Sequence, residues 1–219
     1  MASQELRRAW AEIIEPEDYE THMAAIGQAE ANAHLIKELI DANPLDQGAR
    51  LLFAGAGTGQ MFDYISPAFL QRYCVSFTDI RDEFLDKLRG RLAQSWTGRF
   101  EVFVDDIERP TVGVIDGAAL VLVLEHVDWQ RALTGLIDLG VRNLYLIIQI
   151  NPPEMGDMVA PNRVLPPSMA RVPPEAKSEL VDPIRLEEFL GGHVFSRAVR
   201  IDVPVADGKT MAGFVFRRV

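Results

Sequence analysis

Apolar residues along most of this chain follow two spacings, that of a buried strand and that of an amphipathic helix. From about residue 50 onward, short apolar runs alternate with stretches in which apolar residues recur every three or four positions. The runs predict strands at 49–53, 73–78, 100–104, 118–124 and 144–150. Strands that alternate with helices in this way form a parallel sheet with helices on both faces.

Two helices are predicted before the first strand. Ile26, Ala29, Ala33, Ile36 and Ile40 are spaced by three or four residues, which places them on one face of a helix that ends near Asn43 and Pro44. A weaker helical pattern covers residues 5–14, and the stretch 16–22 between the two patterns is predicted to be a loop. We expect residues 1–48 to form a helical cap or lid on a domain that spans residues 49–219.

The end of the chain predicts a helix and then a hairpin. Asp182 and Pro183 suit the N-cap and the first turn of a helix that stops at Gly191. Strands at 193–205 and 210–219 flank Asp207-Gly208, a pair that suits a type I′ turn. The predicted fold class is α/β, a Rossmann-like and mostly parallel seven-stranded sheet with a C-terminal antiparallel hairpin and helices on both faces.

Composition narrows the classes of partner. The 219 residues contain 22 Lys and Arg against 32 Asp and Glu, a net charge of −10, so we expect no nucleic-acid partner held by phosphate contacts. No apolar run approaches the roughly 20 residues that span a bilayer, and we expect no membrane association. The start of the chain lacks the apolar stretch of a secretory signal, and the lone Cys74 reads as a buried packing residue, so a cytoplasmic location is predicted.

A glycine-rich loop follows the first strand. Gly55, Gly57 and Gly59 stand where the strand turns toward a helix, so the backbone can approach a ligand closely. Asp79 closes the next strand 20 residues after Gly59, where an acid can accept hydrogen bonds from ribose hydroxyls. Taken alone, each feature could also be a tight turn or a solvated turn aspartate. Gln60 replaces the third glycine of the NAD fingerprint, so the ligand is predicted to be nucleotide-like but not NAD.

Four segments in order carry a resemblance to a known family: LLFAGAGTG, FTDI, FVDDIE and LVLEHVDW. They resemble the motifs of class I S-adenosylmethionine-dependent methyltransferases, in particular the small-molecule type with Leu-Glu-His-Val after the fourth strand. The resemblance covers about residues 49–219. It implies S-adenosyl-L-methionine as cofactor and methyl transfer to a small-molecule acceptor with an oxygen or nitrogen nucleophile.

The same resemblance implies a set of cofactor-binding residues. Asp79 would hold the ribose, and Asp106 would meet the adenine amino group, with Asp105 as its competitor because the register is uncertain by one residue. The full set is Gly55, Gly57, Gly59, Gln60, Asp79, Ile80, Asp105, Asp106, Ile107, Leu124 and Glu125. Phe53 stands where the family usually has an acid for the cofactor's ammonium group. Either Gln60 or Glu125 replaces that acid, or cofactor affinity is reduced.

Methyl transfer from a sulfonium needs positioning and removal of a proton from the acceptor. His126 is the first candidate base because it follows the central strand and histidine titrates near neutrality. A structural role for His126, in hydrogen bonds to a neighbouring loop, is an equal alternative. His22 and Tyr19 are second candidates, since the family often folds its N-terminal segment over the cofactor; their alternative is an exposed loop or a helix start.

Residues 152–181 hold seven prolines without sustained periodicity, which predicts an ordered loop over one edge of the sheet. This loop is either an acceptor-specific lid or an interface arm in a homodimer. Its candidate acceptor contacts are Met155, Met158, Met169, Arg163 and Arg171. Asn151-Pro152-Pro153-Glu154 is read as a rigid strand exit. His34 and His193 show no ligand spacing with each other or with Cys74, so no metal is predicted.

Two other functions compete with a small-molecule methyltransferase. Phe53 motivates a catalytically silent cofactor-binding or scaffold protein of the same fold. A protein or nucleic-acid methyltransferase is disfavoured by the net charge of −10 and the lack of a separate recognition domain.

Overall fold

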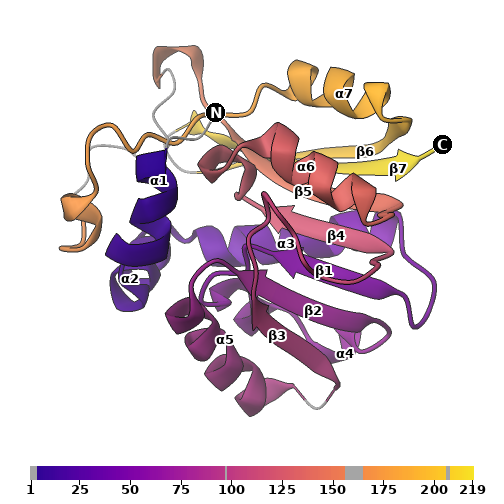
Figure 1. Ribbon diagram of the computed structural model, residues 1–219, viewed down its shortest axis with the longest axis horizontal. Coiled ribbons are helices and arrows are strands. Elements are labelled where there is room, and N and C mark those ends of the chain that lie inside the picture. The colour runs from indigo at the N-terminus through magenta and orange to yellow at the C-terminus, as the bar shows by residue number, and fades with distance from the viewer. Residues whose placement is uncertain (1–3, 97, 156–164, 206–207) are drawn as a thin grey trace.

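The strands form a seven-stranded mixed sheet in a computed structural model that describes residues 4–96, 98–155, 165–205 and 208–219 (Figure 1). The strand order is β3-β2-β1-β4-β5-β7-β6. The first five strands are parallel, and β7 runs antiparallel to both β5 and β6. The bounds are β1 Arg50–Ala54, β2 Cys74–Asp79, β3 Phe100–Val104, β4 Gly117–Val121, β5 Asn143–Ile150, β6 Phe195–Pro204 and β7 Thr210–Arg218. The predicted fold class is confirmed.

Helices cover both faces of the sheet. On one face, α3 (Gln28–Ala42) and α5 (Asp82–Ser95) bury apolar side chains against β1 and β2. On the other, α6 (Trp129–Asp138) and α7 (Pro183–Gly192) pack against β4 and β5. The short helix α4 (Pro67–Leu70) lies before β2. The predicted cap of α7 is confirmed, because the Asp182 carboxylate accepts a hydrogen bond from the Ile184 N–H at 2.8 Å.

The N-terminal residues fold differently from the prediction. Helix α1 (Gln4–Arg8) continues into a π-helical turn at Ala9–Ile13, and α2 spans Pro16–Ile26. The loop predicted for 16–22 is therefore wrong. Pro16 occupies the first turn of α2, where its missing N–H removes no helical hydrogen bond. Figure 1 shows α1 and α2 beside the carboxyl ends of the parallel strands, and residues 4–26 are called the N-terminal cap below.

The described part of the proline-rich loop packs against this cap. The Ser168 N–H donates to the Asp18 carboxylate at 2.6 Å, and the Ser168 hydroxyl accepts from the Glu15 N–H at 3.0 Å. The loop thus lies over the carboxyl ends of the strands, next to α1 and α2, and not over an edge of the sheet as predicted (Figure 1). Two of its candidate contacts, Met158 and Arg163, lie outside the described residues.

Three smaller expectations have separate outcomes. Cys74 is exposed, so its predicted burial is wrong. It is the first residue of β2, where the strand begins at the surface. The β6–β7 hairpin is closed by the Val205 N–H, which donates to the Lys209 carbonyl at 2.9 Å. The type I′ turn predicted at Asp207-Gly208 includes Asp207, which lies outside the described residues. No helix in the described part of the chain is long and apolar enough to cross a bilayer.

Candidate functional site

A cavity of about 990 Å³ opens at the carboxyl ends of β1 and β4, where the order of the strands reverses. Ligands in open α/β sheets bind in this crevice. Pockets for small ligands have volumes of roughly 300–1,000 Å³, so this cavity has room for a nucleotide-sized ligand and a second small molecule. Every predicted cofactor-binding or catalytic residue except Leu124 lines the cavity.

The glycine loop forms one rim of the cavity. Gly55, Gly57 and Gly59 have positive φ angles of 64°, 58° and 76°, the region that favours glycine. A Cβ on Gly59 would lie 2.2 Å from the Leu88 side chain, and one on Gly55 would lie 2.6 Å from Val123. The loop therefore depends on glycine both for its backbone path and for its packing against α5 and the end of β4.

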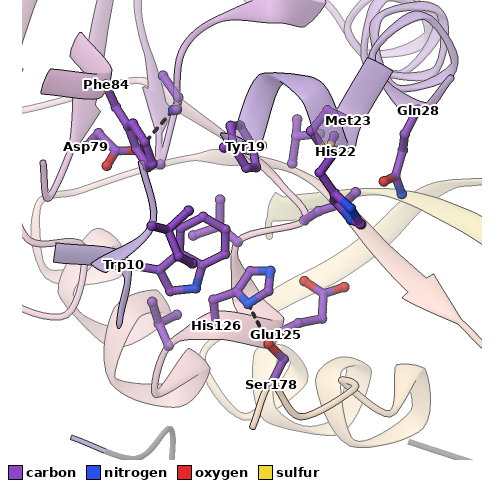
Figure 2. A pocket seen from close by; sticks show the side chains of 18 of the residues that line it. Trp10, Tyr19, His22, Met23, Gln28, Asp79, Phe84, Glu125, His126 and Ser178 are labelled. Atoms are coloured by element: carbon purple, nitrogen blue, oxygen red, sulfur yellow. Dashed lines mark hydrogen bonds between the residues drawn. The ribbon is translucent and has the colours of Figure 1, made fainter. Parts of the chain in front are cut away.

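Asp79 ends β2 directly beside this loop. Asp79 is 8% exposed (Figure 2), and its carboxylate accepts hydrogen bonds from the Gly57 N–H at 2.9 Å and the Arg81 N–H at 3.2 Å. Burial raises the pKa of Asp79, and the two N–H donors oppose that shift. The spacing that linked Asp79 to the glycine loop in sequence thus corresponds to direct contact, and Ile80 lines the same cavity.

The two acids after β3 have different partners. The Asp105 carboxylate accepts from the backbone N–H and the hydroxyl of Thr111, at 3.0 and 2.7 Å, and so holds the loop that follows. Asp106 accepts from the Glu108 N–H at 3.1 Å and pairs with Arg7 of the N-terminal cap at 2.7 Å. Asp106 therefore connects the cavity to the cap, whereas Asp105 stabilises its own loop. Ile107 lines the cavity beside them.

Glu125 lies in a 3-10 turn after β4, at Leu124–His126. Its side chain is 2% exposed, and Oε1 accepts a hydrogen bond from the Gln149 N–H at 2.7 Å. The other oxygen, Oε2, is buried and has no hydrogen-bond partner within the described chain. Burial raises the pKa of Glu125 to about 7. Figure 2 shows Glu125 well apart from Asp79 across the pocket.

His126, the first candidate base, is held by its neighbours. Its Nδ1 forms a hydrogen bond with the Ser178 hydroxyl at 2.7 Å, and its ring packs edge-on against Trp10 with centroids 4.8 Å apart (Figure 2). Burial lowers the pKa of His126 to about 4. The imidazole is therefore neutral at physiological pH and a weak proton acceptor.

Leu124 is placed differently from the prediction. It was expected near the reacting group, but its side chain is packed in the core with α6 and β5, and it does not line the cavity. The reason is the backbone at Leu122, whose φ of 55° turns the chain immediately after β4. Leu122 and Val123 line the cavity in its place.

The cap supplies aromatic and polar side chains to the cavity. Trp10 packs edge-on against Tyr19 and Phe84, with centroids 5.7 and 6.4 Å apart. Burial raises the pKa of Tyr19, and the nearby Asp79 carboxylate adds to the shift, so the phenol stays protonated at neutral pH. His22 also lines the cavity, so both second candidates lie on α2 and face the cavity, with Tyr19 near the start of that helix.

Phe53 and Gln60 occupy the region where an acid was expected. Phe53 is buried and stacks on Phe77 at 5.5 Å, so it belongs to the core. The Gln60 amide donates to the Glu20 carbonyl at 3.1 Å, while its Oε1 is buried without a hydrogen-bond partner in the described residues. Gln60 Oε1 is therefore an acceptor that a ligand in the cavity can use.

Several cavity residues were missed in the sequence. Trp10 and Arg7 come from the cap, and Gln149 comes from β5. Asn32 is 3% exposed and lies on the apolar face of α3, and its Oδ1 has no partner among the described residues. In the sequence, the only indication that Asn32 has a special role is that a polar residue lies between Ala29 and Ala33, two residues of the apolar helix face. In the proline-rich loop, Met169 lines the cavity, whereas Arg171 pairs with Glu15 of the cap at 3.8 Å.

The described residues contain no cluster of three or more side chains suited to hold a metal ion.

No family profile matches the sequence, and no curated protein is similar to it. Solved structures do match. Magnesium protoporphyrin IX methyltransferase (ChlM) from Synechocystis PCC 6803 with bound S-adenosylhomocysteine (SAH) has a TM-score of 0.66 at 16% identity, covering 98% of this chain and 93% of that chain. The chain has the class I methyltransferase fold.

Two further structures show the range of this fold. An O-methyltransferase family 2 protein from Planctomyces limnophilus DSM 3776, in complex with apigenin, matches with a TM-score of 0.66 and 14% identity, covering 98% of this chain and 65% of that chain. The [4+2]-cyclase SpnF matches with a TM-score of 0.64 and 13% identity, covering 85% and 80%. At these identities the matches establish the fold only. The function is inferred from the side chains that line the cavity.

Proposed function

We propose that this protein is a methyltransferase that transfers a methyl group from S-adenosyl-L-methionine to a small molecule with an oxygen or nitrogen nucleophile. One observation carries the proposal. The buried Asp79 carboxylate at the end of β2 accepts from the Gly57 N–H on the rim of a cavity large enough for a cofactor and an acceptor. Solved structures of the same fold that hold S-adenosylhomocysteine support it.

The residues around the cavity fit this cofactor. Asp79, with Ile80 beside it, would bind the ribose hydroxyls, and Asp106 with Ile107 would bind the adenine. The glycine loop would let the backbone approach the methionine part. Gln60 Oε1, a buried acceptor without a partner in the described chain, would take the ammonium group in place of the acid that Phe53 replaces.

When bound, S-adenosyl-L-methionine supplies an electrophilic methyl group on a sulfonium. The protein's own part is to hold the acceptor in line, to exclude water and to remove a proton. Trp10 and Tyr19 of the cap cover the cavity and so exclude water from it. Leu122 and Val123 give the wall at the end of β4 its apolar character.

The test is calorimetric titration of SAH into the purified protein. Asp79→Asn keeps the shape of the side chain but removes its charge, and it should weaken binding by about 1–3 kcal/mol, the range for hydrogen bonds to charged groups. Asp138→Asn, an exposed position at the end of α6 outside this cavity, is the matched control and should bind as the wild type does. No binding to the wild type at high micromolar SAH would reject the proposed function.

A cofactor-binding protein without methyl transfer is the second candidate. Phe53 in place of an acid favours it, and the cyclase SpnF illustrates another activity on the same fold. Methyl release to any acceptor would exclude it. Salt-sensitive binding of RNA or DNA would instead support the alternative of a protein or nucleic-acid methyltransferase. The homodimer and the cytoplasmic location stay predictions.

A further inference from the structure

Glu125 is the one acidic side chain of the cavity with an oxygen that nothing in the described chain satisfies. Oε1 is held by the Gln149 N–H at 2.7 Å, which fixes the carboxylate against the end of β5. Oε2 is buried without a partner and belongs to a residue that lines the cavity. A buried acceptor without a donor costs free energy, so a ligand that donates to Oε2 would be favoured here.

Asn32 adds a second oxygen of the same kind. It comes from α3, is 3% exposed and lines the same cavity, and its Oδ1 also has no partner in the described residues. A carboxylate on the ligand would place like charges or two acceptors together at Glu125. A hydroxyl or a protonated amine would instead donate to Glu125 Oε2.

His126 is less suited to take the acceptor's proton. Its Nδ1 is already paired with the Ser178 hydroxyl, and its ring is packed against Trp10. Its low pKa, about 4, also makes it a poor proton acceptor at neutral pH, whereas the pKa of Glu125, about 7, suits a base that works there. His126 thus fits the structural alternative better than the catalytic one.

We infer that Glu125 Oε2 accepts the proton of the methyl acceptor, and that this acceptor presents a hydroxyl or a protonated amino group. The inference rests on the methyl transfer proposed above. In the step, the O–H or N–H bond of the acceptor breaks and its proton moves to Oε2. The freed electron pair forms the new bond to the methyl carbon, while the carbon–sulfur bond breaks and its electron pair stays on sulfur.

Other titratable groups line the same cavity. His22 reaches it from α2, Lys209 from the end of the β6–β7 hairpin, and His126 from the turn that carries Glu125. A pH profile of the wild type alone would mix their contributions with that of Glu125. The experiment therefore compares variants.

Glu125→Gln preserves the shape of the side chain and removes the proton acceptor, and His126→Asn is the neighbouring control. Each protein is assayed for methyl release with a panel of phenols, aliphatic alcohols and primary amines, together with matched carboxylates such as benzoate for phenol. Glu125→Gln should lower turnover by about 100-fold or more, as for a lost general base. His126→Asn should lower it by less than about tenfold, and the carboxylates should not be methylated. The rise of wild-type turnover with pH through about 7 should disappear in Glu125→Gln.

Two measurements do not depend on turnover. Glu125→Gln should bind SAH within about threefold of the wild type, which shows that the variant is folded and that its cofactor side is intact. In protein labelled with carbon-13 at glutamate carboxyls, the resonance that disappears in Glu125→Gln should titrate well above the ordinary glutamate range of about 4.3. Titration in that ordinary range would overturn the role of Glu125.

The remaining outcomes separate the two proposals. If the wild type methylates panel members and Glu125→Gln does so equally well, the role of Glu125 is wrong and the methyltransferase function stands. If carboxylates are methylated in place of hydroxyls and amines, the acceptor class is wrong. If the wild type binds SAH but methylates no member of the panel, both the methyl transfer and the proton transfer to Glu125 are rejected.

Discussion

The two sides of the cavity differ in how their polar groups are satisfied. On the glycine-loop side, the carboxylates of Asp79 and Asp106 have backbone or side-chain donors within the protein. On the Glu125 side, Glu125 Oε2 is buried without a partner in the described residues. The glycine-loop side is therefore organised before any ligand binds, whereas the Glu125 side is completed only by a ligand. Gln60 Oε1 is the exception on the glycine-loop side, at the point where Phe53 replaces an acid.

The largest expected effect comes from a substitution in the glycine loop. Gly59→Ala places a Cβ 2.2 Å from Leu88 at a residue with φ of 76°, so both strain and overpacking oppose it. We expect a loss of about 2–4 kcal/mol in the free energy of unfolding, together with loss of SAH binding. Urea unfolding and calorimetry measure the two effects. Gly113→Ala is the control, because a Cβ there meets nothing within 4 Å and its φ is not positive. Equal stability of the two variants would contradict the packing argument.

A second effect tests the Glu125 side through its response to pH. The pKa of Glu125 is raised from 4.5 to about 7, so the folded protein binds this proton more tightly than the unfolded chain does. Stability from Glu125 is fully present below pH 4.5 and is lost as pH rises through about 7, by about 3 kcal/mol. Glu125→Gln should abolish this loss, which denaturant unfolding at a series of pH values measures.

The matched variant at His126 should respond in the opposite direction. The pKa of His126 is lowered from 6.5 to about 4, so its contribution to stability is present above pH 6.5 and is lost as pH falls toward 4. His126→Asn should reduce the loss of stability on acidification and leave the alkaline side unchanged. If both variants changed the same side of the profile, burial could not be the cause of the two shifts.

The smallest expected effect concerns the ion pair that joins the cap to the glycine-loop side of the cavity. Arg7→Gln removes the pair with Asp106, whose partners are 42% and 20% exposed, so we expect a loss of less than about 1 kcal/mol in stability. The dissociation rate of SAH should still rise severalfold, because the cap opens more often. Arg8→Gln is the control, since the ion pair of Arg8 is with Glu12 inside the cap. Stopped-flow measurement of SAH release with equal rates for both variants would show that Arg7 does not hold the cap.

The glycine-loop side could be predicted from the sequence because it depends on strand patterns and short spacings along the chain. Strand 100–104 was predicted with its observed bounds, and the spacing between Gly59 and Asp79 reports a contact between adjacent strands. The loop predicted for 16–22 was wrong because proline also suits the first turn of a helix. Leu124 was misplaced because nothing local signals the positive φ of Leu122.

The Glu125 side depends on contacts between distant parts of the chain. Glu125 is fixed by the Gln149 N–H, a backbone group 24 residues away. His126 is held through Nδ1 by Ser178, 52 residues away, and through its ring by Trp10 of the cap. Burial and missing partners have no local sequence signal, so residue type alone favoured His126 over Glu125.

Ser168 has a consequence for how ligands enter and leave. Its N–H and hydroxyl bind Asp18 and Glu15, so the cap over the cofactor side and the proline-rich loop are joined at one buried residue. Neither cover can lift without breaking these bonds or moving the other cover with it. The two ligands would then share one opening event, and the release of both products would be set by a single motion.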